Sequence, residues 1–311
     1  VSAANSHHAM EPRSAAAYWE NGKCHTWGST QSSSFAWPSL SKYIGIKPTQ
    51  LSLVSEFCGG GFGGKGYSYP IMALPALMSK KLNGRPVMMR VSRGEEFFNG
   101  SARAGFQGWV KIGFGADGRV LAMDSYVVQD NGSTSGFWDF QNFGSAASVI
   151  FQPESMRFRG IPVLTNTPPK GPQRGPGENQ TANILEPIMD KAARKLGIDR
   201  LALRMANAPG GGQGGKIGPK RAPLTSAYQR EGLEQGAKKF GYAEKIKKSG
   251  KQPNGKIRAV GIGQAYHAAG YNGWDGMVRI TPDGVLHIHT GVGNLGTYSY
   301  AATSRVAAEV L

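Results

Sequence analysis

The 311-residue chain has only two cysteines, Cys24 and Cys58. Two cysteines exclude a disulfide scaffold, and they exclude a four-cysteine zinc or iron–sulfur site built from this chain alone. No apolar run approaches the roughly 18 residues that a membrane-spanning helix needs. The segment that begins at Val1 has no basic stretch followed by an apolar one, so no export signal is expected. The sequence therefore favours a folded globular chain without a membrane span.

Acidic residues are also scarce. The chain has 20 Asp and Glu residues and 36 Lys and Arg residues, which gives a formal net charge of +16. A nucleic-acid-binding protein would gather its basic residues in one stripe with aromatic residues between them. Here they are spread along the chain, and the one dense run lies within residues 238–251. We expect this run to form a solvated helix face and loop, with an acidic partner subunit as the alternative. Nucleic-acid binding is not expected.

Glycine, by contrast, is abundant at 45 residues, and hydrophobic residues make up 40% of the chain. This composition excludes a disordered protein. At roughly 150 residues per domain, the length allows about two domains. Proline and glycine are dense between residues 209 and 225, which makes this segment the expected linker. We therefore expect one domain over 1–208 and the start of a second over 226–311.

Periodicity and turn signals predict helices and strands in mixed order. Helices are expected at 38–44, 70–82, 179–196, 200–205, 226–240 and 299–311. Strands are expected at 15–20, 24–27, 51–55, 87–91, 108–114, 120–124, 258–266, 277–280 and 285–289. Residues 129–160 are expected to be irregular and 167–177 to form a loop. Hairpins beside helices favour an α+β fold with mixed sheets and packed helices over a doubly wound sheet.

The strongest local motif is CGGGFGGKG at residues 58–66. Successive glycines let backbone N–H groups converge on one concavity, which suits a phosphate or another anion. The spacing fits the dinucleotide pattern GxGxxG, but no acidic residue follows about 20 positions later in a βαβ unit. It also fits a P-loop except at Gly66, where a magnesium-binding Ser or Thr is required. A nucleotide- or phosphate-binding enzyme acting through the Gly59–Gly64 loop is therefore an alternative.

Three stretches of the chain, in matching order and spacing, resemble the molybdopterin-binding large subunits of the xanthine oxidase and aldehyde oxidoreductase family. These stretches are HAMEP at 8–12 with WGSTQ at 27–31, GGGFGGK at 59–65, and TNTPP at 165–169 leading to QRG at 173–175. Together they cover about residues 8–200. The resemblance implies that residues 1–208 form the first molybdopterin-binding domain and that residues 226–311 begin the second.

The resemblance also implies roles for individual residues. Gln31 is similar to the glutamine that faces the molybdenum oxo ligand. The alternative is that Gln31 has no such role and is simply a polar residue at the end of a strand. Gly61, Phe62 and Gly63 match the loop whose backbone amides contact the cofactor. Arg174 matches the arginine beside the pterin, with a salt bridge to an acidic residue as its alternative. No side chain of this chain is expected to ligate the metal.

Other positions depart from the family pattern. Purine-oxidising members carry a glutamate where Gly66 stands and an aromatic residue where Pro176 stands, and residues 144–147 offer no counterpart to their substrate-pocket arginine. Purine hydroxylation is therefore not expected. Near the end of the chain, Gly296 and Thr297 lie where the family has a GQG turn. These residues lie at the start of a helix. Their backbone N–H groups and the Thr297 hydroxyl are candidates for binding a cofactor phosphate.

The resemblance implies an oxidoreductase subunit or fragment that oxidises an aldehyde or N-heteroaromatic carbon using oxygen from water. The expected cofactor is molybdenum–molybdopterin, with the cytosine dinucleotide form as one option. Iron–sulfur clusters and FAD or haem are expected on partner subunits, and the family's catalytic glutamate on a polypeptide carrying the rest of the large subunit. A split gene, a cleaved product and a partial chain are all compatible with this. A non-catalytic subunit is a further alternative, and the compartment is cytoplasmic or periplasmic.

Overall fold

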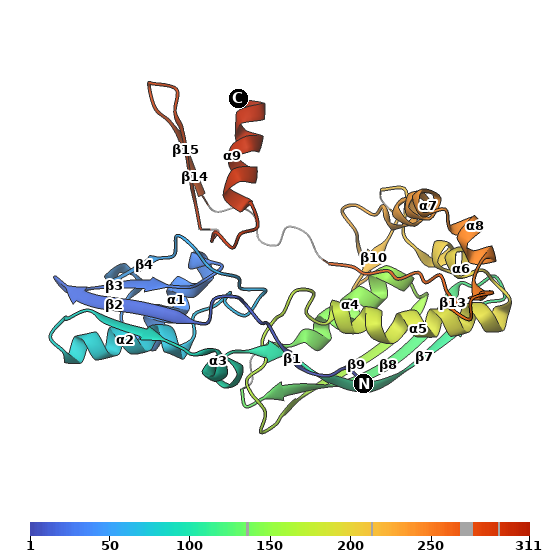
Figure 1. Ribbon diagram of the computed structural model, residues 1–311, viewed down its shortest axis with the longest axis horizontal. Helices are drawn as coiled ribbons and strands as arrows, with labels where there is room; N and C mark the ends of the chain where they lie inside the picture. Colours follow the sequence, from blue (N-terminus) through green and yellow to red (C-terminus); the bar gives the residue numbers. More distant parts are fainter. Residues whose placement is uncertain (135–136, 213, 268–275, 292) are drawn as a thin grey trace. The chain divides into compact units, whose positions relative to one another are not determined.

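The computed structural model describes residues 1–134, 137–212, 214–267, 276–291 and 293–311. The chain divides into two compact units, and each of them is assembled from separated segments of the sequence (Figure 1). Unit 1 comprises Val1–Ala4, Ala104–Thr165 and Gly175–Ala269, and unit 2 comprises Asn5–Arg103, Asn166–Arg174 and Gly270–Leu311. The expected division into domains at 209–225 follows the sequence order instead, and it stays a prediction.

Unit 2 is built on a four-stranded sheet with the order β4-β3-β2-β5. Its strands are β2 (Ser14–Glu20), β3 (Lys23–Gly28), β4 (Leu51–Val54) and β5 (Val87–Arg90). Strands β2 and β3 form the predicted hairpin, because Asn21 and Gly22 both adopt the positive φ that a tight hairpin turn requires. Strand β4 runs parallel to β3, and β5 runs antiparallel to β2.

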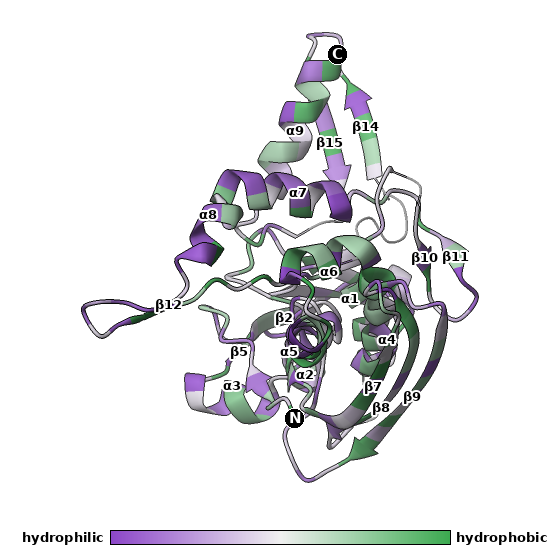
Figure 2. Ribbon diagram, turned by 90° about the vertical axis from the view of Figure 1, so that its right-hand side faces the viewer, coloured by the Kyte–Doolittle hydropathy of each residue, from purple (hydrophilic) through white to green (hydrophobic). Residues whose placement is uncertain are grey.

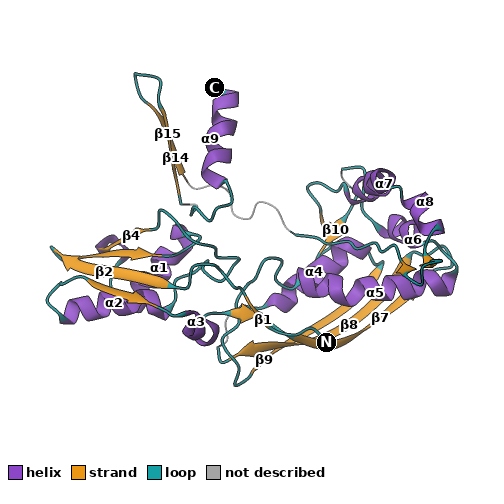
Figure 3. Ribbon diagram, in the orientation of Figure 1, coloured by secondary structure: helices purple, strands orange, loops and turns teal. Residues whose placement is uncertain are grey.

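Two helices, α1 (Ser33–Ile44) and α2 (Pro70–Lys81), cover one face of this sheet (Figure 3). Their apolar residues form one core with the inward residues of the strands, including Ala17, Leu40, Leu51, Met72 and Ala76. Helix α1 begins earlier than predicted, because the Ser32 hydroxyl accepts a hydrogen bond from the Phe35 N–H and caps the helix. It ends at Gly45, as predicted from the left-handed cap that glycine favours.

The remaining elements of unit 2 are short. They are β1 (Asn5–Ser6), η1 (Pro48–Gln50), α3 (Arg93–Asn99), β6 (Ala102–Arg103), β14 (Gly276–Ile280), β15 (Leu286–Thr290) and α9 (Ser299–Val310). Strand β1 pairs with β6, and β14 pairs with β15 in the predicted hairpin. Helix α3 was not predicted, although Ser92 and Glu95 form a capping box, which is a sequence signal for the start of a helix.

Unit 1 is built on the sheet β7-β8-β9, which is packed against helices (Figure 1). Its main elements are β7 (Phe106–Phe114), β8 (Val120–Gly132), α4 (Asp139–Phe151), β9 (Ser155–Leu164), α5 (Glu178–Leu196) and α6 (Arg200–Asn207). Helix α4 is the crossover between the parallel strands β8 and β9. The core combines Val120 and Met123 of β8 with Ile150, Leu185 and Leu203 of the three helices.

The expectation that residues 129–160 are irregular is wrong, because this segment holds the end of β8, all of α4 and the start of β9. Two of its glycines, Gly144 and Gly160, allow close packing rather than turns. A Cβ on Gly144 would lie 2.9 Å from the Phe158 ring, and one on Gly160 would lie 2.2 Å from the Phe140 ring. Positions 135 and 136 of that segment lie outside the described residues.

The other elements of unit 1 are β10 (Lys216–Ile217), β11 (Ala222–Pro223), α7 (Gln229–Phe240), α8 (Tyr242–Lys247), β12 (Gly250–Lys251) and β13 (Ile257–Arg258). The predicted strand over 258–266 is wrong beyond β13. Gly261 and Gly263 weaken a strand in this stretch, and a Cβ on either would meet no atom within 4 Å. Helix α7 buries no residue and is mostly hydrophilic (Figure 2). The lysine-rich run is therefore solvated, as predicted.

The expected fold class, α+β with mixed sheets and packed helices, is confirmed. Of the helices in the described ranges, not one combines the length and the apolar character needed to cross a bilayer.

Candidate functional site

The glycine-rich segment 58–66 is the loop that leads from β4 to α2 in unit 2. Gly60, Phe62 and Gly63 all have positive φ, so the loop folds back on itself. A Cβ on Gly63 would lie 2.3 Å from the backbone oxygen of Pro172. Only glycine lets the loop approach the segment before Arg174 so closely.

Gln31 lies in the connection between β3 and α1, and its side chain reaches this loop. Its Oε1 accepts a hydrogen bond from the Gly63 N–H at 2.9 Å. A Cβ on Gly61 would lie 2.4 Å from the same oxygen. Because Oε1 is held as an acceptor, the carboxamide orientation is fixed and Nε2 is left as a donor. Within the described residues, Nε2 has no hydrogen-bond partner.

Arg174 joins the same place through its backbone and its side chain. Its N–H donates to the Phe62 carbonyl at 2.8 Å, and its guanidinium lies 5.1 Å from the centre of the Phe62 ring. The carbonyl of Arg174 accepts from Arg103 at 2.7 Å. In the part of the chain that the structure describes, the Arg174 guanidinium therefore stacks on a ring rather than pairing with a carboxylate.

The segment that contains Gly296 and Thr297 is anchored beside Gln31 through the residues just before it. The Gly293 N–H donates to the Gln31 carbonyl at 3.2 Å. The Asn294 carbonyl accepts from the Cys58 N–H at 2.8 Å, and its side chain accepts from the Gly296 N–H at 3.2 Å. Every residue expected to bind the cofactor thus belongs to unit 2. These residues lie on four segments of the chain, and hydrogen bonds connect the segments.

Lys65 is buried, with 1% of its surface exposed, and connects the loop to the segments around Glu11 and Ser29. Its ammonium donates to the Glu11 carbonyl at 2.8 Å, to the Glu11 carboxylate at 3.2 Å and to the Ser29 hydroxyl at 2.7 Å. Burial raises the pKa of Glu11, but the Gly59 N–H, the Ser29 hydroxyl and Lys65 together bring it below its usual value. With all three donors engaged, Lys65 has none for a nucleotide phosphate, which removes the P-loop alternative.

Sequence reasoning missed the residues that support the loop. The Arg13 guanidinium pairs with the buried Glu96 and also donates to the Gly64 carbonyl. The ring nitrogens of His7 lie 2.8 Å from the Ser101 carbonyl and 2.7 Å from the Pro172 carbonyl. Single arginines and histidines far apart in the sequence carry no local signal of such contacts.

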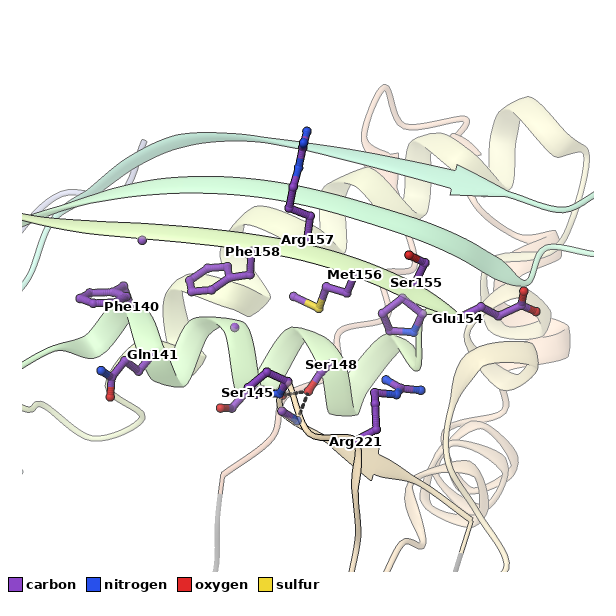
Figure 4. A pocket seen from close by; sticks show the side chains of 15 residues that line it. Phe140, Gln141, Ser145, Ser148, Glu154, Ser155, Met156, Arg157, Phe158 and Arg221 are labelled. Atoms are coloured by element: carbon purple, nitrogen blue, oxygen red, sulfur yellow. Dashed lines mark hydrogen bonds between the residues drawn. The ribbon is translucent and has the colours of Figure 1, made fainter.

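A separate cavity of about 1000 Å³ lies in unit 1, between α4 and β9 (Figure 4). Phe140, Met156 and Phe158 line it, while Arg157 points away from α4 and pairs with Asp124. None of the predicted cofactor-binding residues lines this cavity. In the described ranges, no group of three His, Cys, Asp or Glu residues is placed to hold a metal ion.

Comparison with known proteins shows which family the chain belongs to. Residues 2–208 match the molybdopterin cofactor-binding domain family. The chain is 27% identical to the aldehyde oxidoreductase molybdenum-binding subunit PaoC of Escherichia coli O157:H7, over 98% of this chain and 41% of that protein. It is 29% identical to the aldehyde oxidoreductase of Megalodesulfovibrio gigas, over 91% of this chain and 31% of that protein. The chain thus spans less than half the length of these relatives.

Solved structures give the same result. The aldehyde oxidoreductase from Desulfovibrio gigas superposes with a TM-score of 0.75 at 26% identity, covering 93% of this chain and 32% of that one. Quinoline 2-oxidoreductase from Pseudomonas putida 86 shares the fold, with a TM-score of 0.75 at 20% identity, over 95% of this chain and 40% of that one. The chain belongs to the molybdopterin cofactor-binding domain family, and its relatives are molybdenum-binding subunits of the xanthine oxidase and aldehyde oxidoreductase type.

Proposed function

We propose that this chain is the cofactor-binding part of a molybdenum hydroxylase that oxidises an aldehyde or N-heteroaromatic carbon with oxygen from water. The observation that carries the proposal is the Gln31 carboxamide. The Gly63 N–H holds its Oε1, so that Nε2 is a donor without a partner among the residues that the structure describes. When bound, the molybdenum–molybdopterin cofactor supplies the oxygen transfer and accepts two electrons. A neutral donor beside it can stabilise developing negative charge without adding a charge of its own.

The surrounding residues fit such a cofactor. The main chain of Gly61–Gly63 forms a tight bend where added side chains would collide with Gln31 and Pro172. The Arg174 guanidinium, stacked on Phe62, supplies positive charge at the edge of that bend. Gly296 and Thr297, next to a segment bonded to Gln31, are the proposed phosphate contacts. We assign the cofactor-binding role to these residues together.

The remaining parts of the enzyme are proposed to lie on other polypeptides. These are the rest of the large subunit with the catalytic glutamate, an iron–sulfur subunit, and a flavin or cytochrome subunit. Residues 1–208 are the proposed first cofactor-binding domain, which the family match over 2–208 supports. Residues 209–225 are the proposed linker and 226–311 the start of the second domain.

The test uses the complex purified with its partner polypeptides. We expect molybdenum and a pterin in stoichiometric amounts, measured by elemental analysis and by the fluorescence of the oxidised pterin. Gln31→Ala should keep the metal but lower kcat roughly 100-fold or more, as for the loss of one preorganised donor. Gln107→Ala, on the exposed side of β7, is the control. A complex active without molybdenum would refute the proposal, and unchanged turnover in Gln31→Ala would favour a non-catalytic subunit.

A further inference from the structure

Strand β9 forms one edge of the three-stranded sheet in unit 1. Within the described residues it pairs only with β8, and the pairing runs from Ser155 to Leu164. Among these residues, the main chain on its other side therefore has no partner strand. At 10 residues, β9 is also longer than the roughly five or six residues of an average strand. Unpaired N–H and C=O groups along such an edge are a template for a further strand.

The cavity of about 1000 Å³ in unit 1 lies along this strand, between β9 and α4 (Figure 4). Met156 and Phe158, at alternate positions of β9, line it with half-buried side chains, and Phe140 of α4 lines it as well. Side chains alternate between the two faces of a strand. A strand added beside β9 would therefore direct every second side chain toward this apolar cavity.

The turn between β10 and β11 lines the same cavity and is fixed to α4. The Gly218 N–H donates to the Ser148 hydroxyl at 2.9 Å, and the Lys216 N–H donates to Oε1 of Gln152 at 3.0 Å. Nε2 of Gln152 donates to the Lys216 carbonyl at 3.0 Å in return. One wall of the cavity is thus in place before any ligand binds, and a preformed wall lowers the entropic cost of binding.

The opposite face of β9 carries exposed positive charge. Arg157 points away from α4 and pairs with Asp124 (Figure 4). The Arg159 guanidinium lies 5.2 Å from the centre of the Tyr126 ring and 5.9 Å from that of the Trp109 ring. In the part of the chain that the structure describes, no carboxylate pairs with Arg159. A neighbouring strand would place one of its side chains next to this guanidinium.

These charges distinguish the possible occupants of the edge. A second copy of β9 would bring its own arginines to the face that carries Arg157 and Arg159, where like charges on neighbouring strands repel. A strand with a carboxylate at that position would instead pair with Arg159. The edge therefore favours an acidic segment of a different polypeptide.

We propose that an extended segment of another polypeptide adds to β9 as a fourth strand, with apolar side chains in the cavity and an acidic side chain between them beside Arg159. Main-chain hydrogen bonds supply affinity in this mode of recognition, and the alternating side chains supply specificity. Pro162 has no N–H, so the pairing is confined to residues 155–161. The inference does not depend on the proposed function, because β9 belongs to unit 1 and Gln31 to unit 2.

The experiment measures binding of synthetic peptides to the full 311-residue chain. The probe is a short fluorescein-labelled peptide in which valine and glutamate alternate, and fluorescence anisotropy gives its Kd. The control peptide has the same composition, with the valines and the glutamates in separate blocks. We expect the alternating peptide to bind at least about tenfold more tightly, because only its side chains match both faces of β9.

N-methylation tests the main-chain hydrogen bonds of the alternating peptide. The N–H groups of a strand point alternately to its two sides, so only one of the two alternate sets of nitrogens faces β9. Methylation of that set should weaken binding at least about tenfold, and methylation of the other set should be tolerated. Equal effects of the two methylated sets would contradict strand addition.

Charge reversal tests the outer face. Arg159→Glu should weaken binding of the alternating peptide at least about tenfold, and Arg159→Lys should retain most of it, because the lysine keeps the charge. Lys111→Glu is the matched control, because it reverses an exposed cation on the same face but on β7, at the other edge of the sheet. If Lys111→Glu weakened binding as much as Arg159→Glu, the peptide would not be bound specifically at β9.

Hydrogen exchange locates the bound peptide in the wild-type chain, without relying on the stability of a variant. Amides of residues 155–161 should exchange more slowly when the alternating peptide is bound, and amides of residues 107–113 in β7 should not change. Equal affinity for the alternating and the block peptide, or unchanged exchange at 155–161, would overturn the proposal. A dimer in sedimentation velocity that dissociates in Arg159→Glu would also overturn it, because the occupant of the edge would then be a second copy of the chain.

Discussion

At the scale of the residue, His7 shows how burial and hydrogen bonding compete. Its two ring nitrogens face the carbonyls of Ser101 and Pro172, and both contacts favour a protonated ring. Burial nevertheless lowers the pKa of His7 below the usual 6.5, more than these carbonyls raise it, and Arg13 and Arg103 act in the same direction as burial. The neutral ring has one N–H, so it donates to one of the two carbonyls at a time.

This shift predicts a pH dependence of stability. The pKa of His7 is lower in the folded chain than in the unfolded chain, so the unfolded chain binds the proton more readily. The contribution of His7 to the free energy of unfolding is therefore fully present above pH 6.5 and is lost as the pH falls below 6.5. We expect the free energy of unfolding to fall between about pH 7.5 and about pH 5.5, and to fall less in His7→Gln.

Urea unfolding at the two pH values measures this difference. His289→Gln, on the exposed side of β15, should leave the pH dependence as it is in the wild type. An unchanged slope in His7→Gln would mean that His7 titrates alike in the folded and unfolded chain.

At the scale of the element, the glycine loop can be probed by two substitutions that differ in what they displace. In Gly63→Ala the new Cβ meets the fixed backbone of Pro172 at 2.3 Å, and φ at this position is positive. In Gly61→Ala the new Cβ meets the end of the Gln31 side chain at 2.4 Å, which can move away. The first substitution strains the loop, and the second displaces a functional group.

We expect Gly63→Ala to lower the free energy of unfolding by roughly 2–4 kcal/mol and to prevent cofactor retention. Gly61→Ala should cost about 1 kcal/mol or less but reduce turnover, because Gln31 loses its fixed orientation. Gly236→Ala is the control, because it lies in α7 with no atom near its Cβ and should stabilise by about 0.5–1 kcal/mol. Urea unfolding and molybdenum content separate the cases. Equal stability losses at positions 61 and 63 would contradict this account.

Elements were predictable where their signals are local. The hairpin at Asn21-Gly22 and the helix that ends at Gly197 each depend on a cap or turn residue that any reader of the sequence can find. Helix α4 was missed because Gly144 resembles a turn signal while it serves the contact with Phe158. A glycine needed for close packing and a glycine needed for a turn look the same in the sequence. Only the tertiary structure distinguishes them.

At the scale of the whole molecule, the same limit applies to the candidate site. Family motifs predicted that Gln31, Phe62 and Arg174 act together. In the structure Arg174 bonds to Phe62, and Gln31 bonds to the residue that follows Phe62. The residues that support them, Arg13 and His7, were not predictable, because their partners lie between 51 and 165 positions away in the sequence. The assembly of each unit from separated segments was equally hidden, because the loop predicted at 167–177 does not show that the chain passes from one unit to the other there.

Burial is distributed unevenly over the chain, and this predicts a gradient of local stability. Leu185 and Met189 of α5 are fully buried, whereas α9 buries no residue and leaves Val306 and Val310 mostly exposed. An isolated helix of α9's length is marginal in water, because tertiary packing supplies most helix stability in proteins. The amides of α9 should therefore open far more often than those of α5.

Hydrogen exchange followed by mass spectrometry tests this in the chain alone. We expect peptides from residues 299–310 to exchange at least about 100-fold faster than peptides from residues 185–193. Adding the polypeptide proposed to carry the rest of the large subunit should slow exchange in α9 and leave α5 unchanged, because new packing would cover the exposed valines. Similar protection of both helices in the chain alone would contradict the gradient. If the amides of α9 exchanged at the same rate after the polypeptide was added, the apolar residues of α9 would have no role in assembly.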